Sequence, residues 1–572
     1  MRKLSLCILA ALLGACATTE RPSATIAPVD VPEITRPDGE TAAWWFRSGA
    51  AAAAERGAME GRARNVILVI GDGMSLTTVA AARILAGQRE GAPGEERRLS
   101  WEDFPHTALS RTYNTDLQTP DSAGTMTAMA TGVKTRAGVI GVGQARVRGD
   151  CTDLAGNALL SVRDLAESAG MATGIVTTTR VTHATPSGTY AHSPDRNWEG
   201  DVRLPADAAA AGCTDIARQL VERPGRGPDV IFGGGRRYFM TAQQRDPERA
   251  DKVGLRLDGR DLIAGWQARH PGGAYVWNRD DMAAARDRRP ILGLFEYDHL
   301  HFEHDRPADP GEPSLAELTV EAIRRLQDAP EGYFLLVEGG RIDHAHHYGN
   351  AHRALVDTIA LADAVQAAIE ATDAHDTLIL VTADHAHTLT FAGYPRRGNP
   401  ILGKVRGSSD EDASAGWALD GLGLPYTTLG YANGPGYTGA SASQAEGPKA
   451  FFHVGSGFQP ARGRPDLTAV DTEHPDYMQE AILPMGSESH GGDDVGIWAH
   501  GPGSHAVRGN VEQHTIFHFM VQAAPRLRQR LCAQGLCNAD GVPVTLPDPA
   551  DFGFGPKDFA EAQAGTGAAT AD

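Results

Sequence analysis

The sequence has few positive charges relative to negative ones. Its 572 residues include 53 Lys and Arg against 72 Asp and Glu, which gives a formal net charge of −19. A nucleic-acid-binding protein needs a basic surface that displaces counterions from phosphates, so this balance argues against nucleic acid as a partner. It does not exclude a small anionic ligand, because a few buried metal ions can reverse the sign of the local field.

The N-terminus lacks an apolar run long enough to cross a bilayer. Arg2 and Lys3 precede the short apolar stretch Leu4–Leu13, a pattern typical of a signal peptide over residues 1–16. The stretch ends in Leu-Gly-Ala-Cys, which resembles the bacterial lipoprotein processing box. We therefore expect an exported protein, lipid-anchored at Cys16 to a bacterial membrane and facing the periplasm or cell surface. The alternative is an ordinary signal peptide with a chance cysteine.

Cysteine is scarce as well, with six in the chain, of which Cys7 and Cys16 belong to the leader. An even number remains, which in an exported protein predicts two disulfides. No histidine lies beside any of these four, so a cysteine metal site is disfavoured. Four cysteines allow three pairings. The simplest joins the two that are close in sequence, 532 and 537, and separately the two that are far apart, 151 and 213. The four cysteines are Cys151, Cys213, Cys532 and Cys537.

From residue 65 onward, short apolar runs alternate with helical stretches, and we find no internal repeat. Runs of Val, Ile and Leu bounded by Gly or Asp are typical of buried parallel strands. Their alternation with helices predicts an α/β fold with a central, mostly parallel sheet flanked by helices. The clearest runs are 65–70, 173–178, 229–232, 332–337, 377–382 and 494–499.

Composition divides the chain further. An Ala-rich, helical stretch at 40–64 carries Trp44 and Trp45, and a segment rich in Gly, Ser and Pro interrupts the strand–helix rhythm. We expect this segment to form an inserted subdomain outside the main sheet. The predicted divisions are a signal peptide at 1–16, a tether at 17–39, a catalytic domain at 40–395 and 486–552, the insertion at 396–485 and a flexible tail at 553–572.

Carboxylate and imidazole residues follow three of the predicted strands. Asp72 and Glu338 come at the ends of two runs, and Asp384 with His385 ends a third. The carboxyl ends of parallel strands meet at the edge where such folds bind ligands. Carboxylates gathered there would repel one another unless cations neutralise them. Each residue alone is more typical of a turn or helix cap, but together they predict a metal site.

Further metal-type ligands lie between and after these strands. Asp343 and His347 are four residues apart, so one helical turn places both on the same face. His490 lies in a Glu-Ser-His sequence just before the last predicted strand. Mixed His and Asp ligands without a thiolate favour zinc, whereas an all-oxygen set favours magnesium.

Ser122 begins a run of small residues, Ser-Ala-Gly-Thr-Met-Thr-Ala. This run suits a helix whose N-terminus presents free backbone N–H groups to an anion. A serine at such a position is commonly only an N-cap. The run by itself therefore leaves a catalytic role for Ser122 open.

Taken together, these segments closely resemble the alkaline phosphatases over roughly residues 40–540. The match is specific because the segments come in the family's order, although Ser75 departs from the usual glycine after Gly-Asp-Gly-Met. The matching segments are Gly71–Met74, Asp121–Thr125, Thr182–Pro186, Val337–His344, Thr382–His385 and the Glu-Ser-His around His490.

The resemblance implies hydrolysis of phosphate monoesters, with Ser122 as the nucleophile that forms a covalent phosphoserine. Arg196, eleven residues after Thr185, would clamp the phosphoryl oxygens. The implied cofactors are two zinc ions and one magnesium. Their implied ligands are Asp343, His347 and His490 for the first zinc, Asp72, Asp384 and His385 for the second, and Asp72, Thr185 and Glu338 for magnesium.

The resemblance is closest to the animal branch, as His183 and His344 indicate. Together with His387, these histidines would orient ligands or phosphate. The insertion resembles that branch's crown domain, and a homodimer is implied through the 40–64 helix and the crown. The implied disulfides are Cys151–Cys213 and Cys532–Cys537. The matching calcium positions are Glu248, the Phe295 carbonyl, Glu296 and Glu312, where the family usually has Asp.

Two other classes of function compete with this one. A phosphodiesterase or sulfatase of the same superfamily is disfavoured, because Thr185 and Glu338 indicate a magnesium site and Ser122 lacks the sulfatase motif. A non-catalytic phosphate-binding lipoprotein is disfavoured because the sequence retains every zinc ligand.

Overall fold

The structure is a computed structural model that describes residues 26–34, 39–307, 311–407 and 416–555. The expected signal peptide and Cys16 lie outside the described residues. Within those ranges, no helix combines the length and the apolar character that a membrane crossing requires.

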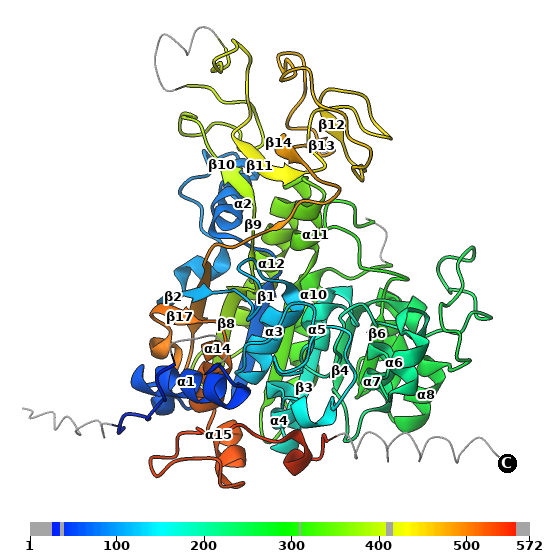
Figure 1. Cartoon of the computed structure of the whole chain (residues 1–572), viewed down its shortest axis with the longest axis vertical. Helices are drawn as coiled ribbons and strands as arrows, with labels where there is room; N and C mark the ends of the chain where they lie inside the picture. The colour runs from blue at the N-terminus through cyan, green and yellow to red at the C-terminus, as the bar shows by residue number, and fades with distance from the viewer. Residues whose placement is uncertain (1–25, 35–38, 308–310, 408–415, 556–572) are drawn as a thin grey trace, which may run out of the picture.

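A ten-stranded sheet forms the centre of the molecule (Figure 1). Its strands are parallel except where β16 pairs antiparallel with both of its neighbours. In order, the strands are β17 (Gly509–Glu512), β2 (His106–Arg111), β16 (Val495–His500), β8 (Thr377–Ala383), β1 (Asn65–Gly71), β7 (Tyr333–Gly339), β3 (Ala172–Arg180), β4 (Val230–Gly234), β6 (Ile291–Leu294) and β5 (Ala274–Val276).

All six apolar runs predicted as strands are strands, and the mostly parallel α/β fold is confirmed. The last run was expected to be parallel, which is wrong, because β16 is antiparallel to β8. An apolar run shows that a strand is buried on both faces, but it carries no information about the strand's direction.

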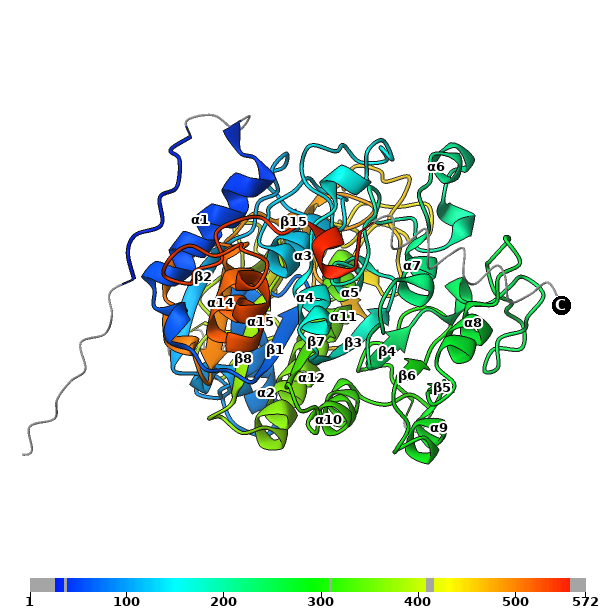
Figure 2. The same ribbon diagram turned by 90° about the horizontal axis from the view of Figure 1, so that it is seen from below.

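Both faces of the sheet are covered. In β1, Val66, Leu68 and Ile70 pack into one core cluster, while Ile67 and Val69 pack into the other, as the two-residue repeat of a strand requires. Figure 2 shows α1, α14 and α15 on one side of the strands and α2, α10 and α12 on the other.

The helices divide between these two cores. Those on the first face are α1 (Ala42–Glu55), α3 (Ser122–Thr131), α4 (Val162–Ser168), α5 (Ala184–Ser187), α7 (Ile216–Glu222), α8 (Leu262–Arg269), α14 (Thr515–Ala523) and α15 (Pro525–Cys532). Those on the second are α2 (Leu76–Arg89), α9 (Arg279–Ala284), α10 (Leu315–Leu326), α11 (Arg341–His347) and α12 (Ala351–Ala371). A short helix, α6 (Ala206–Ala210), lies apart.

Small sheets outside the main one build an upper lobe, seen at the top of Figure 1. The described part of the predicted insertion contributes most of their strands. The three-stranded sheet consists of β10 (Leu389–Phe391), β11 (Leu429–Gly434) and β14 (Ala481–Pro484), and a second pair is β12 (Lys449–Ala450) with β13 (Tyr477–Met478). Because β10 precedes residue 396, the lobe begins slightly before the predicted boundary.

The two ends of the described chain pack onto the body. Ile26 and Val29, within the predicted tether, contact a small cluster that includes Ala50 of α1 and Val542. Phe554, within the predicted flexible tail, is buried and lies 5.0 Å from the Arg223 guanidinium. We expected the Gly/Ala-rich segment 553–572 to be flexible. Residue 554 differs, because its aromatic side chain packs against the body.

Two disulfides are present, Cys151–Cys213 and Cys532–Cys537. These are the simplest of the three open pairings and the ones that the family resemblance implies. Cys213 lies in a small cluster with Trp198, outside the two main cores. The cross-links therefore restrain peripheral segments rather than the sheet.

Candidate active site

Strand register brings the predicted carboxylates together at one sheet edge. Gly71 of β1 is paired with Ala383 of β8 on one side and with Gly339 of β7 on the other. Asp72 and Asp384 are therefore the first residues after two adjacent strands, and Glu338 is the last but one of the third.

Asp72, Asp384 and His385 form the first cluster, and all three are buried. His385 Nε2 lies 3.3 Å from Asp384 Oδ2 and 3.5 Å from Asp72 Oδ1. Ligands bound about 2.0–2.1 Å from a tetrahedral zinc ion lie about 3.3 Å from one another, so the spacing fits one such ion. Both oxygens of Asp72 and Oδ2 of Asp384 have no hydrogen-bond partner. Burial and Asp384 raise the pKa of Asp72, as expected of carboxylates that need a cation.

Ser122 is the first residue of α3, as the run of small residues predicts. The N-cap is Asp121, whose side chain accepts a hydrogen bond from the Gly124 N–H at 3.1 Å. Ser122 Oγ lies 3.2 Å from His385 Nε2. The hydroxyl thus lies at about the same distance from His385 Nε2 as the two carboxylates do.

Asp343, His347 and His490 form the second cluster. His347 Nε2 and His490 Nε2 lie 3.3 and 3.4 Å from Asp343 Oδ1, and 3.1 Å from each other. Asp343 and His347 come from one turn of α11. His490 arrives through a two-residue strand pair, β15 (His490–Gly491) with β9 (Ala386–His387). The three predicted ligands again fit a single zinc ion.

The third cluster contains Asp72, His183 and Glu338. Glu338 Oε1, the buried Thr185 hydroxyl and His183 Nδ1 have no hydrogen-bond partner. Burial raises the pKa of Glu338 to about 7, which is typical of a carboxylate prepared for a cation. Thr177, which the sequence did not single out, also hydrogen-bonds Glu338. This oxygen-rich set suits magnesium.

Arg196 contacts Asp121, the residue before Ser122. Its Nη1 donates to Asp121 Oδ2 at 3.0 Å, and its Nη2 donates to His183 Nε2 at 3.3 Å. Asp121 therefore caps the helix that carries the nucleophile and also holds the arginine. Sequence reasoning missed this second role, although Asp121 stands in the same motif.

The alkaline phosphatase family model matches residues 63–525. The chain belongs to the alkaline phosphatase family. It is 44% identical over 472 residues to the tissue-nonspecific alkaline phosphatase of Gallus gallus and 42% identical over 470 residues to that of Homo sapiens, covering 81% of this chain and 84% of each relative. The alkaline phosphatase of Gadus morhua is 42% identical, with 92% of its length covered.

Solved structures agree with this assignment. The Thermus thermophilus alkaline phosphatase matches with a TM-score of 0.58 at 26% identity, covering 83% of this chain and 93% of that one. The enzyme of the Antarctic bacterium TAB5 matches with a TM-score of 0.52 at 20% identity, over 81% and 98%, which supports the fold alone. As a member of this family, the chain is a phosphoric monoester hydrolase.

In this family member, His387 supports the second cluster. Its Nε2 donates to Asp343 Oδ1 at 2.7 Å, and its Nδ1 hydrogen-bonds the buried Glu488. Burial alone lowers the pKa of His387, but the charges of Glu488 and Asp343 raise it to about 10. Glu488 belongs to the Glu-Ser-His motif around His490, and no local pattern in the sequence predicts that it binds His387.

The close packing here requires glycine at position 73. Gly73 has a φ of +68°, and a Cβ added to it would lie 2.4 Å from His387 Cδ2. Its N–H donates to Asp384 Oδ1 at 3.0 Å. Ser75, the departure from the family pattern, caps α2 by accepting from the Thr78 N–H. The substitution therefore acts on the helix that follows the site.

His344 completes the set of predicted neighbours. Its Nδ1 accepts from Arg341 Nη1 at 2.9 Å, and its ring lies 5.3 Å from that of His183. A third ring, His299, lies 4.3 Å from His344 and was not predicted. The three imidazoles lie against one another, and His183 contacts Arg196.

The expected calcium residues come together only in part. Glu296 and Glu312 are buried and form a cluster with His301, whose Nδ1 lies 2.9 Å from Glu312 Oε2. Glu248 accepts from Arg236 Nη2 at 2.6 Å. Burial and the neighbouring charges of Glu248 and Glu312 raise the pKa of Glu296 to about 7. A calcium ion at these residues stays a prediction.

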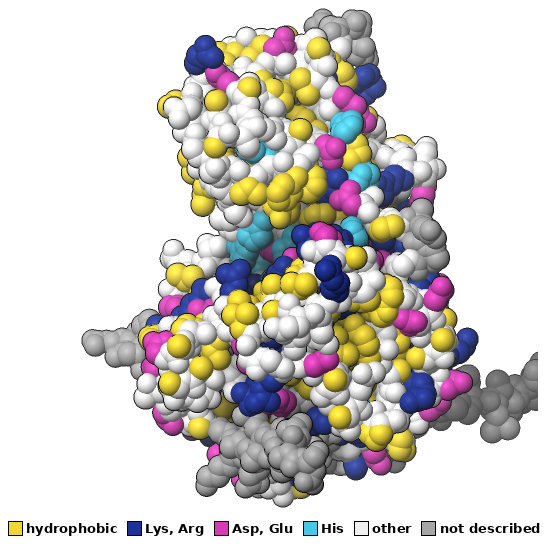
Figure 3. Space-filling view, turned by 90° about the vertical axis from the view of Figure 1, so that its right-hand side faces the viewer, with side chains coloured by type: hydrophobic (Ala, Val, Ile, Leu, Met, Phe, Trp, Pro, Cys, Tyr) yellow, Lys and Arg dark blue, Asp and Glu magenta, His cyan; other side chains and the backbone are white. Residues whose placement is uncertain are grey.

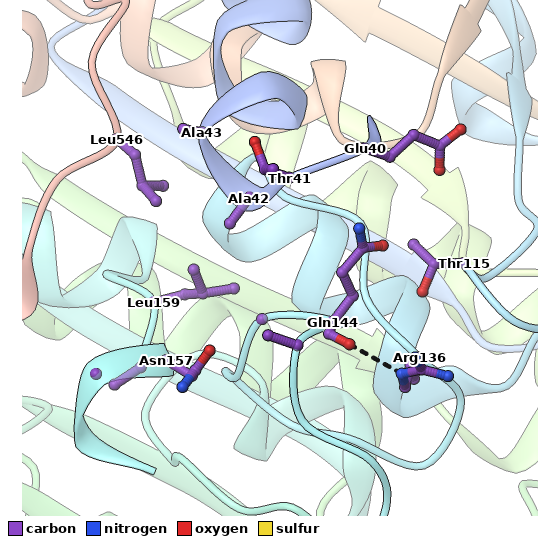
Figure 4. A pocket seen from close by; sticks show the side chains of 14 residues that line it. Glu40, Thr41, Ala42, Ala43, Thr115, Arg136, Gln144, Asn157, Leu159 and Leu546 are labelled. Atoms are coloured by element: carbon purple, nitrogen blue, oxygen red, sulfur yellow. Dashed lines mark hydrogen bonds between the residues drawn. The ribbon is translucent and has the colours of Figure 1, made fainter. Parts of the chain in front are cut away.

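One cavity of the described residues lies apart from these clusters. A cavity of about 690 Å³ opens beside the start of α1, where Arg136 donates to the Gln144 carbonyl (Figure 4). None of the predicted site residues lines it. Figure 3 instead shows histidine side chains in the hollow between the upper lobe and the main body.

Proposed function

We propose that this enzyme hydrolyses phosphate monoesters through a covalent phosphoserine at Ser122, with two zinc ions and one magnesium. The observation that carries the proposal is the 3.2 Å separation of Ser122 Oγ from His385 Nε2, which also faces Asp72 and Asp384. A hydroxyl in that position is placed to act as a nucleophile beside a cation rather than as a simple helix cap.

The residues present fit the three ions. Partnerless oxygens of Asp72, Asp384, Glu338 and Thr185, all of them buried, line the two cation sites that Asp72 joins. When bound, zinc and magnesium would supply Lewis-acid charge that lowers the pKa of a hydroxyl or water and neutralises phosphoryl oxygens. Calcium binding at Glu248, Glu296 and Glu312 stays a prediction outside this proposal.

The chain's own residues then account for the chemistry. Ser122 Oγ attacks phosphorus, and the bond from phosphorus to the ester oxygen breaks as the Oγ–P bond forms. Water next attacks the phosphoserine, which releases inorganic phosphate and restores the hydroxyl. Arg196, held by Asp121, orients the phosphoryl oxygens, and the N-terminus of α3 adds its positive dipole end.

The remaining predictions concern where the enzyme works. Export, lipid anchoring at Cys16 to a bacterial membrane and a homodimer through the 40–64 helix and the insertion are proposals that rest on the sequence. Loss of membrane attachment in C16S would support the anchor, and continued attachment would refute it.

The test is to trap the intermediate. Protein incubated with a ³²P-labelled monoester and quenched in acid is expected to carry label on the peptide containing Ser122. S122A should carry none and retain no more than about 10⁻³ of the turnover, whereas S168A, a serine of α4, should behave as wild type. Label on another residue, or near-normal turnover of S122A, would refute the proposal. Elemental analysis should find two zinc ions and one magnesium per chain.

A further inference from the structure

The two imidazoles of the second cluster come from distant parts of the chain. His347 ends α11, whereas His490 follows the upper lobe, 143 residues later. No single element carries both, so the 3.1 Å between their Nε2 atoms depends on contacts between elements. A zinc site needs fixed ligand geometry, and the neighbours of the ligands supply it.

One strand of the upper lobe, β11, contacts the residue that precedes each of these imidazoles. The Tyr431 hydroxyl lies 2.7 Å from Nδ1 of His346. The Asn433 side chain makes two hydrogen bonds with Ser489, in which its Nδ2 donates to Ser489 Oγ and its Oδ1 accepts from the Ser489 N–H, both at 2.9 Å. The strand thus reaches both halves of the cluster through two side chains.

The position of β11 is itself fixed on both sides. It is the middle strand of its sheet, where Tyr431 pairs with Leu389 of β10 and with Ala481 of β14. Side chains two residues apart leave a strand on the same face, about 7 Å from one another. Tyr431 and Asn433 therefore offer two anchor points at a set spacing. Figure 1 shows β11 at the base of the upper lobe, above α11.

His346 is held at both ring nitrogens. Its Nε2 lies 3.0 Å from the Thr78 hydroxyl of α2, while its Nδ1 contacts Tyr431. The ring also stacks on His387 at 4.9 Å, and His387 donates to the predicted ligand Asp343. With both nitrogens engaged, His346 has none left for a metal ion. Because His346 and Tyr431 are buried, loss of the tyrosine hydroxyl would leave a ring nitrogen without its partner.

The end of β11 lies against the segment that leads to His490. A Cβ added to Gly434 would lie 3.0 Å from Glu488 Cβ. The Glu488 N–H donates to the His347 carbonyl at 2.9 Å, and His347 Nδ1 donates to the Glu488 carbonyl at 2.6 Å. The strand, this segment and the end of α11 are therefore in mutual contact. A shift of β11 would move the two imidazoles relative to one another.

We propose that Tyr431 and Asn433 are positioning residues, which set the separation of His347 and His490 and thereby the affinity of the second cluster for zinc. Each acts through the residue that precedes a ligand. The first cluster follows strands of the main sheet, so its affinity for zinc does not depend on β11. This inference rests on the function proposed above, in which both clusters hold zinc.

The test measures how strongly each zinc ion is held. Y431F and N433A, loaded with zinc and magnesium, are equilibrated against increasing chelator, and elemental analysis gives the metal retained per chain. One zinc ion should bind about 10- to 100-fold more weakly than in wild type, the range typical of a lost partner of a metal ligand. The other zinc ion and the magnesium should be retained as in wild type. Excess zinc should restore kcat.

A second background shows which ion is affected. H490A removes a ligand of the second cluster, so the zinc that it retains occupies the first. Adding Y431F to H490A should leave the affinity for that remaining zinc unchanged. The matched controls are Y477F and N399A, which alter a buried tyrosine and a buried asparagine elsewhere in the upper lobe. Both should keep wild-type zinc affinity even where Tm falls.

Three results would overturn the inference. They are wild-type zinc affinity in either Y431F or N433A, an equal weakening of both zinc ions and magnesium, and a lowered kcat that excess zinc does not restore. Failure of the proposed function is distinct, because H490A alone would then retain as much zinc as wild type.

Discussion

Two buried charged regions of this molecule solve the same problem in opposite ways. At the sheet edge, Asp72 and Asp384 have oxygens without any hydrogen-bond partner. On α4, Asp164 hydrogen-bonds both Arg163 and Arg223, and Glu167 accepts from Arg163 Nη1 at 2.7 Å. The first region has a surplus of negative charge, whereas in the second two carboxylates face two guanidinium groups.

The difference teaches how to separate a functional site from a structural one. Both regions hold carboxylates at negligible exposure, so burial alone does not distinguish them. What distinguishes them is whether the protein supplies the counter-charge itself. A region that leaves buried carboxylates uncompensated is stable only when a cation binds, whereas a self-neutralised network contributes to the fold alone.

The largest expected effect comes from removing the cations. EDTA should abolish phosphatase activity and lower Tm, and zinc with magnesium should restore both, because the sheet-edge carboxylates then lose and regain their counter-charge. Activity assays and thermal scans measure this. The Arg163 network needs no ion, so activity that survives complete chelation would erase the contrast between the two regions.

The second prediction breaks the self-neutralised region. D164N should destabilise the protein by about 3–5 kcal/mol, because it leaves buried guanidinium charge partly unpaired. Denaturant unfolding measures the loss. Zinc and magnesium content and kcat at 25 °C should remain those of wild type, and a changed metal content would show that the two regions are coupled.

The third prediction concerns Arg196, which belongs to both kinds of arrangement. It pairs with Asp121, yet part of its guanidinium is available to phosphate. R196A should lower kcat/KM about 10²-fold, as loss of one charged donor typically does, and weaken inhibition by phosphate. Tm should change little. R196K restores the charge but not the paired N–H donors of the guanidinium, so it should recover only part of the lost kcat/KM.

The smallest expected effect concerns pH. The contributions of Glu338 and Glu167 to stability should depend on pH with opposite signs. In chelated protein, burial holds the pKa of Glu338 near 7, above its ordinary 4.5, so its contribution to stability is lost as the pH rises from about 4.5 through 7. Chelated E338Q should therefore exceed chelated wild type in Tm by ~2 °C or more at pH 8 and match it at pH 4.5.

Glu167 should behave in the opposite way. Burial alone would raise its pKa, but Arg163 and Arg223 lower it below the ordinary 4.5. Its stabilising contribution is thus present at neutral pH and lost as the pH falls below about 4.5. E167Q should be less stable than wild type at pH 7, and the difference should shrink under acidic conditions. The comparison would be contradicted if the stability difference from wild type changed with pH in the same direction for E338Q and E167Q.

The sequence alone determined the features that depend on local patterns. The apolar runs end one or two residues before β1, β7 and β8 end, and their pattern predicts that the residues that follow, such as Asp72 and Asp384, lie at one edge of the sheet. The spacing of Asp343 and His347 likewise put both on one face of α11. Local chemistry fixes strands, helical faces and helix starts, because each depends only on neighbours in the chain.

Only the tertiary structure decided the rest. His490 reaches its cluster through the two-residue pairing of β15 with β9, the direction of β16 follows from its neighbours, and Arg236 hydrogen-bonds Glu248. Each of these contacts closes a long loop, and whether it forms depends on the packing of the whole domain rather than on any local pattern.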